Sequence, residues 1–198
     1  MPFTTPSSPK RFGDNPARLR FHSGHTWVRA IGREMAFVGT TEFALAFAGA
    51  LETILLPREQ LLVRPGTLLW SLVSREGRRL GQVSPLGGRV LVVNTGVLKD
   101  LDRLQRSPYG SGWLVCIQSP TLPQFCQNLP PLEPDLLGLE RMTRAMTQVL
   151  GPAADSIRVQ DRWKARFGDD LADDQWESLR SKLFPEFRTA ESRSDPTT

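Results

Sequence analysis

The stretch VRPGTLLWSLVSREGRRLGQVSPLGGRVLVVN, residues 63–94, decides the fold. Two apolar runs, TLLWSLV (67–73) and GRVLVVN (88–94), flank a middle that is rich in Gly and Arg. Apolar runs of this length, interrupted by turn residues, are typical of β-strands that exposed turns connect. We therefore predict that the two runs are strands of a hairpin, with SREGRRLGQ (74–82) at its solvent-exposed tip.

Length and composition indicate one ordinary domain with additional segments. The chain has 198 residues, of which 39% are hydrophobic and 23% charged, values typical of a globular protein. No apolar run approaches the roughly 18 residues that cross a bilayer. The first residues, MPFTTPSSPKRFGDNPARLRF, lack the apolar segment of a secretory signal. We expect a cytoplasmic protein without membrane attachment.

Cysteine and histidine are too few and too badly spaced for a metal site or a catalytic group. The two cysteines, Cys116 and Cys126, do not form a metal-binding pair such as C-x-x-C. Cys116 lies in the apolar run WLVCIQ and is expected to pack in the core. The only histidines are His22 and His25, and no Ser or Cys motif accompanies them. We therefore expect no metal and no enzyme activity; a disulfide between Cys116 and Cys126 is an open alternative that a reducing compartment does not support.

The basic residues are scattered rather than clustered. The net charge is +4, and the densest groups are Lys10-Arg11 and the tip arginines Arg75, Arg78 and Arg79. A nucleic-acid protein usually shows a basic stripe interleaved with aromatic residues, or a recognisable module. This chain has neither, so we expect no nucleic-acid binding.

Proline content and apolar spacing divide the chain into four segments. Residues 1–18 hold four of the sixteen prolines and are predicted to be a disordered leader. Short strands and one helix, over 40–50, fill a domain at 19–130. A helical extension follows at 131–187, and a disordered tail at 188–198. Apolar residues recur at helical spacing in two segments of the extension, 133–151 and 169–187, and a further short helix is expected over 157–168.

Five pieces of sequence, in order, resemble the glycine cleavage H-protein family, whose members have a lipoyl/biotinyl-type domain. The resemblance covers residues 25–117 and implies a mainly β fold, a barrel-sandwich hybrid with short helices. The α-helical C-terminal extension lies beyond it. The matching pieces are HTWVR, VGTTEFALAFAGALETILLP, RPG, SPLGGRVLVVN and SPYGSGWLVCI.

In that family, one lysine at a hairpin tip forms an amide with lipoate, and the resulting arm travels between enzymes. Counting from Gly66 places that position at Glu76, whereas counting back from Pro85 places it at Gly77, and neither is a lysine. The family's nearby glutamate is replaced by Val73 or Ser74. Arginine stays charged and does not accept a lipoyl group. The four lysines of the chain lie elsewhere, at Lys10, Lys99, Lys164 and Lys182.

The resemblance and the missing lysine lead to two functional hypotheses. The first is a non-catalytic H protein-like domain that has lost its lipoylation site, binds no cofactor and acts as a protein-interaction or scaffolding module. Its predicted partner contacts are Arg75, Arg78, Arg79 and His25. The alternative is a lipoyl-carrier H protein of glycine cleavage, with lipoate as cofactor, which shuttles the aminomethyl group. The C-terminal helices are predicted either to pack on the domain or to pair with a second copy.

Overall fold

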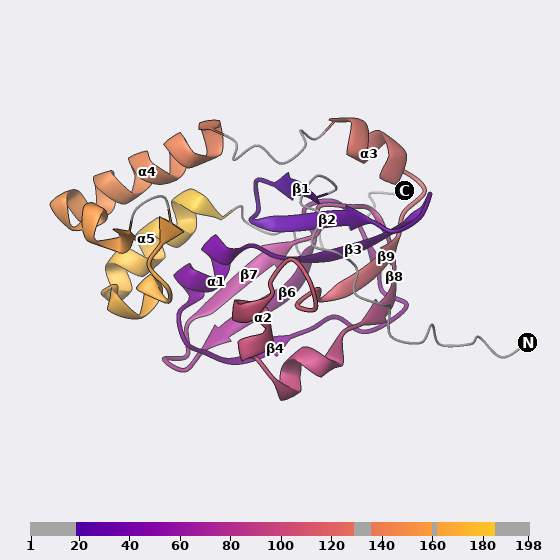
Figure 1. Cartoon of the computed structure of the whole chain (residues 1–198), viewed down its shortest axis with the longest axis horizontal. Helices are drawn as coiled ribbons and strands as arrows, with labels where there is room; N and C mark the ends of the chain where they lie inside the picture. Colours follow the sequence, from indigo (N-terminus) through magenta and orange to yellow (C-terminus); the bar gives the residue numbers. More distant parts are fainter. Residues whose placement is uncertain (1–18, 129–135, 160–161, 185–198) are drawn as a thin grey trace, which may run out of the picture.

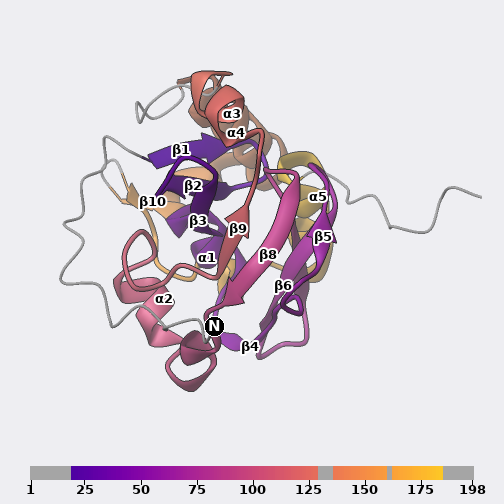
Figure 2. The same cartoon turned by 90° about the vertical axis from the view of Figure 1, so that its right-hand side faces the viewer.

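The computed structural model describes residues 19–128, 136–159 and 162–184. Two antiparallel sheets share one hydrophobic core, and the C-terminal helices cover one end of it (Figures 1 and 2). The six-stranded sheet has the order β1 (Leu19–His22), β2 (Thr26–Ala30), β3 (Met35–Thr40), β9 (Val115–Gln118), β8 (Gly88–Val93) and β5 (Leu62–Val63). The three-stranded sheet has the order β4 (Leu51–Leu55), β6 (Leu68–Ser74) and β7 (Arg79–Val83).

Helices connect and extend the sheets. Inside the sheet domain they are α1 (Glu42–Ala48), the 3-10 helix η2 (Thr95–Lys99), α2 (Asp102–Arg106) and α3 (Leu122–Asn128). We call residues 136–184 the extension. It consists of α4 (Leu136–Leu150), η3 (Gly151–Ile157), the short strands β10 (Arg158–Val159) and β11 (Arg162–Trp163), η4 (Phe167–Asp170) and α5 (Asp173–Leu183).

In each strand of the six-stranded sheet, every second side chain points to the inner face of the sheet. Val28, Val38, Val90 and Ile117 are all buried and belong to one core cluster. Side chains of paired residues point to the same face of a sheet, so the pairs Val28–Val38 and Val90–Ile117 place these residues together. The mainly β fold with C-terminal helices that the sequence predicted is confirmed.

The central hairpin differs from its prediction. Strand β6 pairs with β7, which lies inside the polar middle, whereas β8 joins the other sheet beside β9 and β5. The prediction that residues 67–73 and 88–94 pair with each other is therefore wrong. The polar Gln82 of β7 is buried because its Oε1 accepts a hydrogen bond from Trp70 Nε1 at 2.8 Å, and its Nε2 donates to the His25 carbonyl at 2.8 Å.

Helix α1 lies between the sheets and the extension. Thr41 caps its start, because Thr41 Oγ1 accepts a hydrogen bond from Ala44 N at 3.3 Å. Gly49 ends it with a φ of +80°, a conformation that favours glycine. Every residue from Phe43 to Ala48 is buried, since both faces of the helix are covered.

The extension packs against α1 of the sheet domain. The aromatic rings of Phe167, Trp176 and Phe184 all lie against the ring of Phe47. The helices predicted within 133–151 and 169–187 are confirmed as α4 and α5 for the described residues. The short helix predicted over 157–168 is wrong, because β10 and β11 pair there as a small hairpin and η4 only begins at its end. The predicted leader and tail lie outside the described residues.

A close contact between η4 and α1 leads to a stability prediction. A Cβ added at Gly168 would lie 1.8 Å from the Phe47 carbonyl oxygen, so Gly168→Ala must push the extension away from α1. We expect the free energy of unfolding to fall by about 1–3 kcal/mol, measured by urea denaturation. Gly32→Ala is the matched control, because its Cβ would meet only the Met35 side chain at 3.7 Å. Equal stability of the two variants would contradict the close packing.

Candidate functional site

The tip of the β6–β7 hairpin is a tight turn over residues 75–78. Gly77 N donates to the Ser74 carbonyl at 3.0 Å, and Ser74 N donates to the Arg78 carbonyl at 2.9 Å. Gly77 has a φ of +80°, which a residue with a Cβ rarely adopts. The turn therefore fixes the direction in which Arg78 leaves the hairpin.

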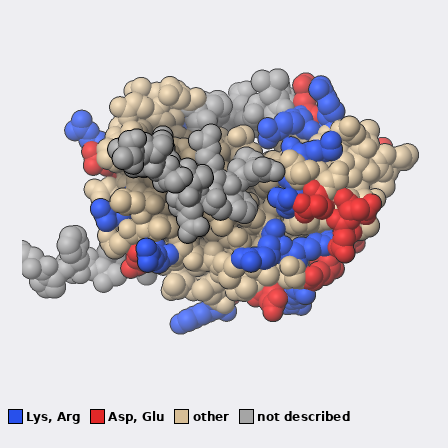
Figure 3. Space-filling view, turned by 180° about the vertical axis from the view of Figure 1, so that it is seen from behind, with Lys and Arg blue, Asp and Glu red and all other residues tan. Residues whose placement is uncertain are grey.

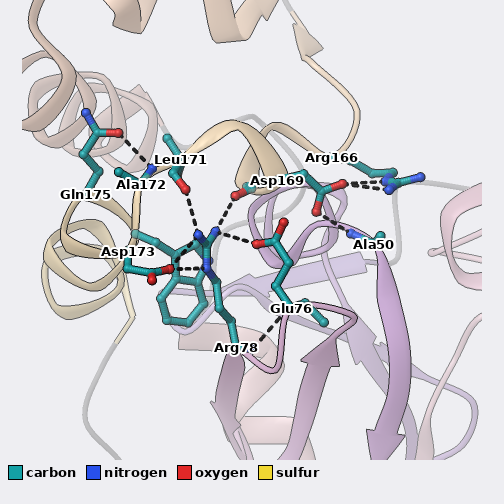
Figure 4. A network of polar contacts seen from close by, with 12 residues as sticks. Ala50, Glu76, Arg78, Arg166, Asp169, Leu171, Ala172, Asp173 and Gln175 are labelled. Atoms are coloured by element: carbon teal, nitrogen blue, oxygen red, sulfur yellow. Dashed lines mark hydrogen bonds and ion pairs between the residues drawn. The ribbon is translucent and has the colours of Figure 1, made fainter.

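The Arg78 guanidinium joins the hairpin tip to the extension (Figure 4). Its Nη1 donates to the Gly168 carbonyl at 2.8 Å, and its Nη2 donates to the Leu171 carbonyl at 2.7 Å. Its Nη2 also lies 2.8 Å from Asp173 Oδ1, and Glu76 Oε2 is 3.3 Å from Nη1. The guanidinium carbon lies 5.9 Å from the centre of the Trp176 ring, within the range of a cation–π contact.

The main-chain carbonyls contribute more to this contact than the carboxylate does. The Arg78 side chain is only 14% exposed, whereas that of Asp173 is 92% exposed, so water screens the charge pair. The Gly168 and Leu171 carbonyls accept charge-assisted hydrogen bonds from the part-buried guanidinium. Removal of the guanidinium would leave both carbonyls without this donor.

A second polar contact lies beside the first one. Asp169 Oδ1 accepts a hydrogen bond from Ala50 N at 2.8 Å, and the Ala50 carbonyl accepts one from Arg75 N at 2.8 Å. Arg166 forms an ion pair with Asp169 at 2.8 Å and holds its carboxylate in place. The main chains of the hairpin tip and the α1–β4 junction are thus connected to each other, and the Asp169 carboxylate connects the junction to η4.

The other two tip arginines have a different environment from Arg78. Arg75 and Arg79 are exposed, and neither has an ion pair with another residue that the structure describes. Figure 3 shows Lys and Arg interleaved with Asp and Glu over the face seen from behind. The predicted role of Arg75 and Arg79 in partner contact stays a prediction, and Arg78 contacts the chain's own extension.

His25 lies at the junction of the sheets, α1 and the extension. Its ring centre is 4.6 Å from that of Phe43 and 4.7 Å from that of Phe184, and its Nε2 is buried. Burial, with a smaller effect of the positive Arg141, lowers the pKa of His25 from 6.5 to about 3. Two of the four predicted partner-contact residues, Arg78 and His25, contact the extension. The extension covers both of them.

The described lysines lie outside the β6–β7 hairpin. Lys99 ends η2, Lys164 forms an ion pair with Asp170 at 2.6 Å, Lys182 lies on α5, and Lys10 is outside the described residues. Both cysteines are free, and burial raises the pKa of the Cys116 thiol to about 11. Within the described ranges no group of three His, Cys, Asp or Glu residues could hold a metal ion.

No helix of the described chain has the length and apolar character needed to cross a bilayer.

The main features missed by the sequence reasoning are the acceptors around Arg78. Two of them are main-chain carbonyls, at Gly168 and Leu171, which any residue type can supply. The segment FGDDLADDQW (167–176) did contain a signal, since glycine followed by acidic residues before a helix indicates a close contact and a charged helix start.

This fold, with its hairpin tip and α1, belongs to a known class of protein. The family model for "Glycine cleavage H-protein" matches residues 19–133, more than half of the chain. The chain therefore belongs to the glycine cleavage H-protein family. The match ends before the first helix of the extension.

Individual relatives give the same family. The chain is 32% identical over 108 residues to the glycine cleavage system H protein of Thermosynechococcus vestitus, covering 54% of this chain and 84% of that protein. It is 33% identical over 99 residues to the same-named protein of Hydrogenovibrio crunogenus, covering 50% and 76%. A crystal structure of a glycine cleavage system H protein from Mycobacterium marinum gives a TM-score of 0.49, with 26% identity over 52% of this chain and 85% of that one.

The contacts of Arg78 lead to a second stability prediction. Arg78→Ala should lower the free energy of unfolding by about 2 kcal/mol, because two carbonyls lose a charged donor. Asp173→Ala should cost less than about 1 kcal/mol, because this carboxylate is exposed. Arg79→Ala, an exposed neighbour, should stay within about 0.5 kcal/mol of the parent. Urea denaturation measures all three, and a larger loss for Asp173→Ala than for Arg78→Ala would contradict the ranking.

The burial of His25 predicts a dependence of stability on pH. The folded protein keeps His25 neutral down to about pH 3, whereas the unfolded chain binds a proton below about pH 6.5. The contribution of neutral His25 to the free energy of unfolding is therefore complete above pH 6.5. It decreases as the pH falls, by up to about 1.4 kcal/mol per pH unit.

His25→Asn is the matched control for this pH dependence. His25 has a φ of +56°, a conformation that asparagine tolerates better than most residues, and asparagine does not titrate. Urea denaturation at pH 7.5 and pH 5 should show a smaller loss of stability for the variant than for the parent. If the parent and the variant lose the same amount of stability between pH 7.5 and pH 5, groups other than His25 cause the acid sensitivity.

Proposed function

We propose that this member of the glycine cleavage H-protein family is a non-catalytic protein-interaction module without a lipoyl group. The observation that carries the proposal is the hairpin tip, which presents Arg75, Glu76, Gly77 and Arg78 and no lysine. Amide formation with lipoate requires a primary amine, which these four residues lack in their side chains.

The environment of the tip also favours this function. A carrier arm has to leave the tip and move through solvent, whereas Arg78 is bound by two carbonyls and a carboxylate of the extension. Ala50 and Asp169 add further contacts at the same place. A tip that is held in this way suits a fixed contact surface better than a mobile arm.

Under this proposal the chain binds no cofactor and catalyses no reaction. Its relatives are named as H proteins of the glycine cleavage system, so the lipoyl carrier remains the alternative function. In that case a lysine outside the tip would have to accept lipoate. Lys99 is the only lysine of the described sheet domain, and it lies on η2, outside the β6–β7 hairpin.

The mass of the intact protein tests the proposal. The full chain is produced together with a lipoate ligase and free lipoate, beside the H protein of Thermosynechococcus vestitus as positive control. We expect the control to gain the mass of a lipoyl group and this chain to keep its unmodified mass. A gain of that mass on this chain would overturn the proposal, and Lys99→Arg would then show whether Lys99 is the acceptor.

A further inference from the structure

The outer face of the six-stranded sheet is the side turned away from the core. Val28, Val38 and Val115 point inward into the core cluster, so the residues that alternate with them along the strands point outward. Paired residues share a face. The strand register therefore arranges outward residues in two neighbouring rows: Arg29, Phe37, Cys116 and Val92 in one, and Met35, Gln118, Arg89 and Leu62 in the other.

Exposed apolar side chains gather on this face. Among the described residues six large apolar side chains are exposed, and four of them lie here: Ile31 (37%), Met35 (41%), Val92 (46%) and Leu62 (68%). Ile31 follows Arg29 by two residues, and its N donates to the Met35 carbonyl at 2.8 Å. Single exposed apolar residues are ordinary, whereas a group on one sheet face indicates an interaction surface. We call these four residues, with Arg29 and Arg89, the outer patch.

A β-bulge in β8 turns Val92 toward solvent. In a regular strand Val90 and Val92 would point to the same face, because they are two residues apart. Val90 is fully buried in the core, whereas the pairing shifts between Val90 and Val92, so that Val92 lies opposite the outward Cys116. Bulges can redirect a side chain in this way. The strand thus presents to solvent an apolar residue that regular pairing would bury.

The chain covers one end of the outer face itself and leaves the other end open. At the covered end Trp27 is fully buried, and its ring centre lies 6.3 Å from that of Tyr109. In the middle, the rings of Phe37 and Trp113 stack with centres 4.6 Å apart and are half-buried. The open end holds Met35 and Leu62, so the outer patch borders a rigid aromatic layer.

The charges of the outer face have one sign. Arg29 and Arg89 are the only charged residues at outward positions of the six strands, within the part of the chain that the structure describes. The Arg29 guanidinium carbon lies 5.4 Å from the centre of the Trp27 ring. Acidic side chains would complement this face. A second copy of the same face would bring more arginines against these two, so charge favours a different protein as the partner.

The width of the open end fits one α-helix. Met35 and Leu62 lie three strand spacings apart, about 14 Å, and a helix with its side chains is about 10–12 Å wide. The apolar side chains of the outer patch offer no hydrogen bonds to a partner's main chain. A helix satisfies its own main-chain groups and can therefore cover such a face without loss.

We propose that the outer patch binds an amphipathic helix of a partner protein, whose apolar stripe covers Met35, Val92 and Leu62 and whose acidic flanks face Arg29 and Arg89. This inference rests on the proposed function, because it names the surface through which the interaction module acts and the chemistry of its partner.

A designed peptide tests the site in the full-length chain. The probe is a fluorescein-labelled peptide of about 18 residues, long enough to form a helix, made of Ala, Leu and Glu. Its leucines form one stripe, and its glutamates flank that stripe. Fluorescence anisotropy measures the binding. We expect saturable binding to the parent protein, and binding about tenfold weaker when lysines replace the glutamates of the peptide.

Matched variants locate the binding on the outer patch. Leu62→Ser and Arg89→Glu should each weaken binding of the acidic peptide about tenfold, and Arg89→Glu should improve binding of the lysine peptide. Leu98→Ser and Arg79→Glu are the controls, because Leu98 is 43% exposed on η2 and Arg79 is exposed on the other sheet. Both controls should bind like the parent. All four side chains are exposed, so these variants keep the fold.

Several outcomes would overturn the proposal. These are an acidic peptide that does not bind, and one that binds Leu62→Ser and Leu98→Ser equally. Binding of phosphatidylglycerol vesicles or of single-stranded oligothymidine that Leu62→Ser abolishes, without peptide binding, would assign the face to a lipid surface or a nucleic acid. A dimer in light scattering that Leu62→Ser dissociates would assign it to a second copy. The intact-mass experiment is independent of all these results, so failure here is distinct from failure of the proposed function.

Discussion

Six of the seven residues of helix α1 are buried, and the rest of the structure depends on keeping them covered. All its residues from Phe43 to Ala48 are buried. A helix that is apolar all round needs neighbours on every side. The two sheets supply one side, and Phe167, Trp176 and Phe184 of the extension supply the other. Exposure of a large apolar side chain costs about 1.5–3 kcal/mol, so the domain and the extension form one core.

The hairpin tip shows how one turn geometry can serve two purposes. A short antiparallel hairpin projects its turn away from the sheet, which is the requirement for a mobile arm. Here the same projection brings Arg78 to the turn of the extension, where its donors meet the carbonyls of Gly168 and Leu171. A guanidinium with five donors in a fixed plane suits this contact, because it can bind several acceptors at once. The tip anchors the extension to the sheet domain.

Much of the fold could be predicted from local patterns, and the exceptions have physical causes. Local patterns predicted short strands and one helix over 40–50, and α1 lies within that range. The pairing of β6 with β7 was missed because Gln82 looks like a surface residue, although its hydrogen bond to Trp70 allows it to be buried. The family resemblance identified the tip as the important turn. It could not show that the extension contacts Arg78 of that turn, because two of the acceptors are main-chain carbonyls, which any residue type can supply.

The contact between Gly168 and the Phe47 carbonyl has a consequence for how this chain can evolve. The two residues lie in different segments, one within the family match at 19–133 and one beyond it. A bulkier residue at position 168 is compatible with the fold only if α1 shifts, and such a shift alters the inner packing of the sheet domain. Drift in the extension is therefore coupled to drift in α1. The two segments have to change together across descendants of this chain, as the two sides of a binding interface do.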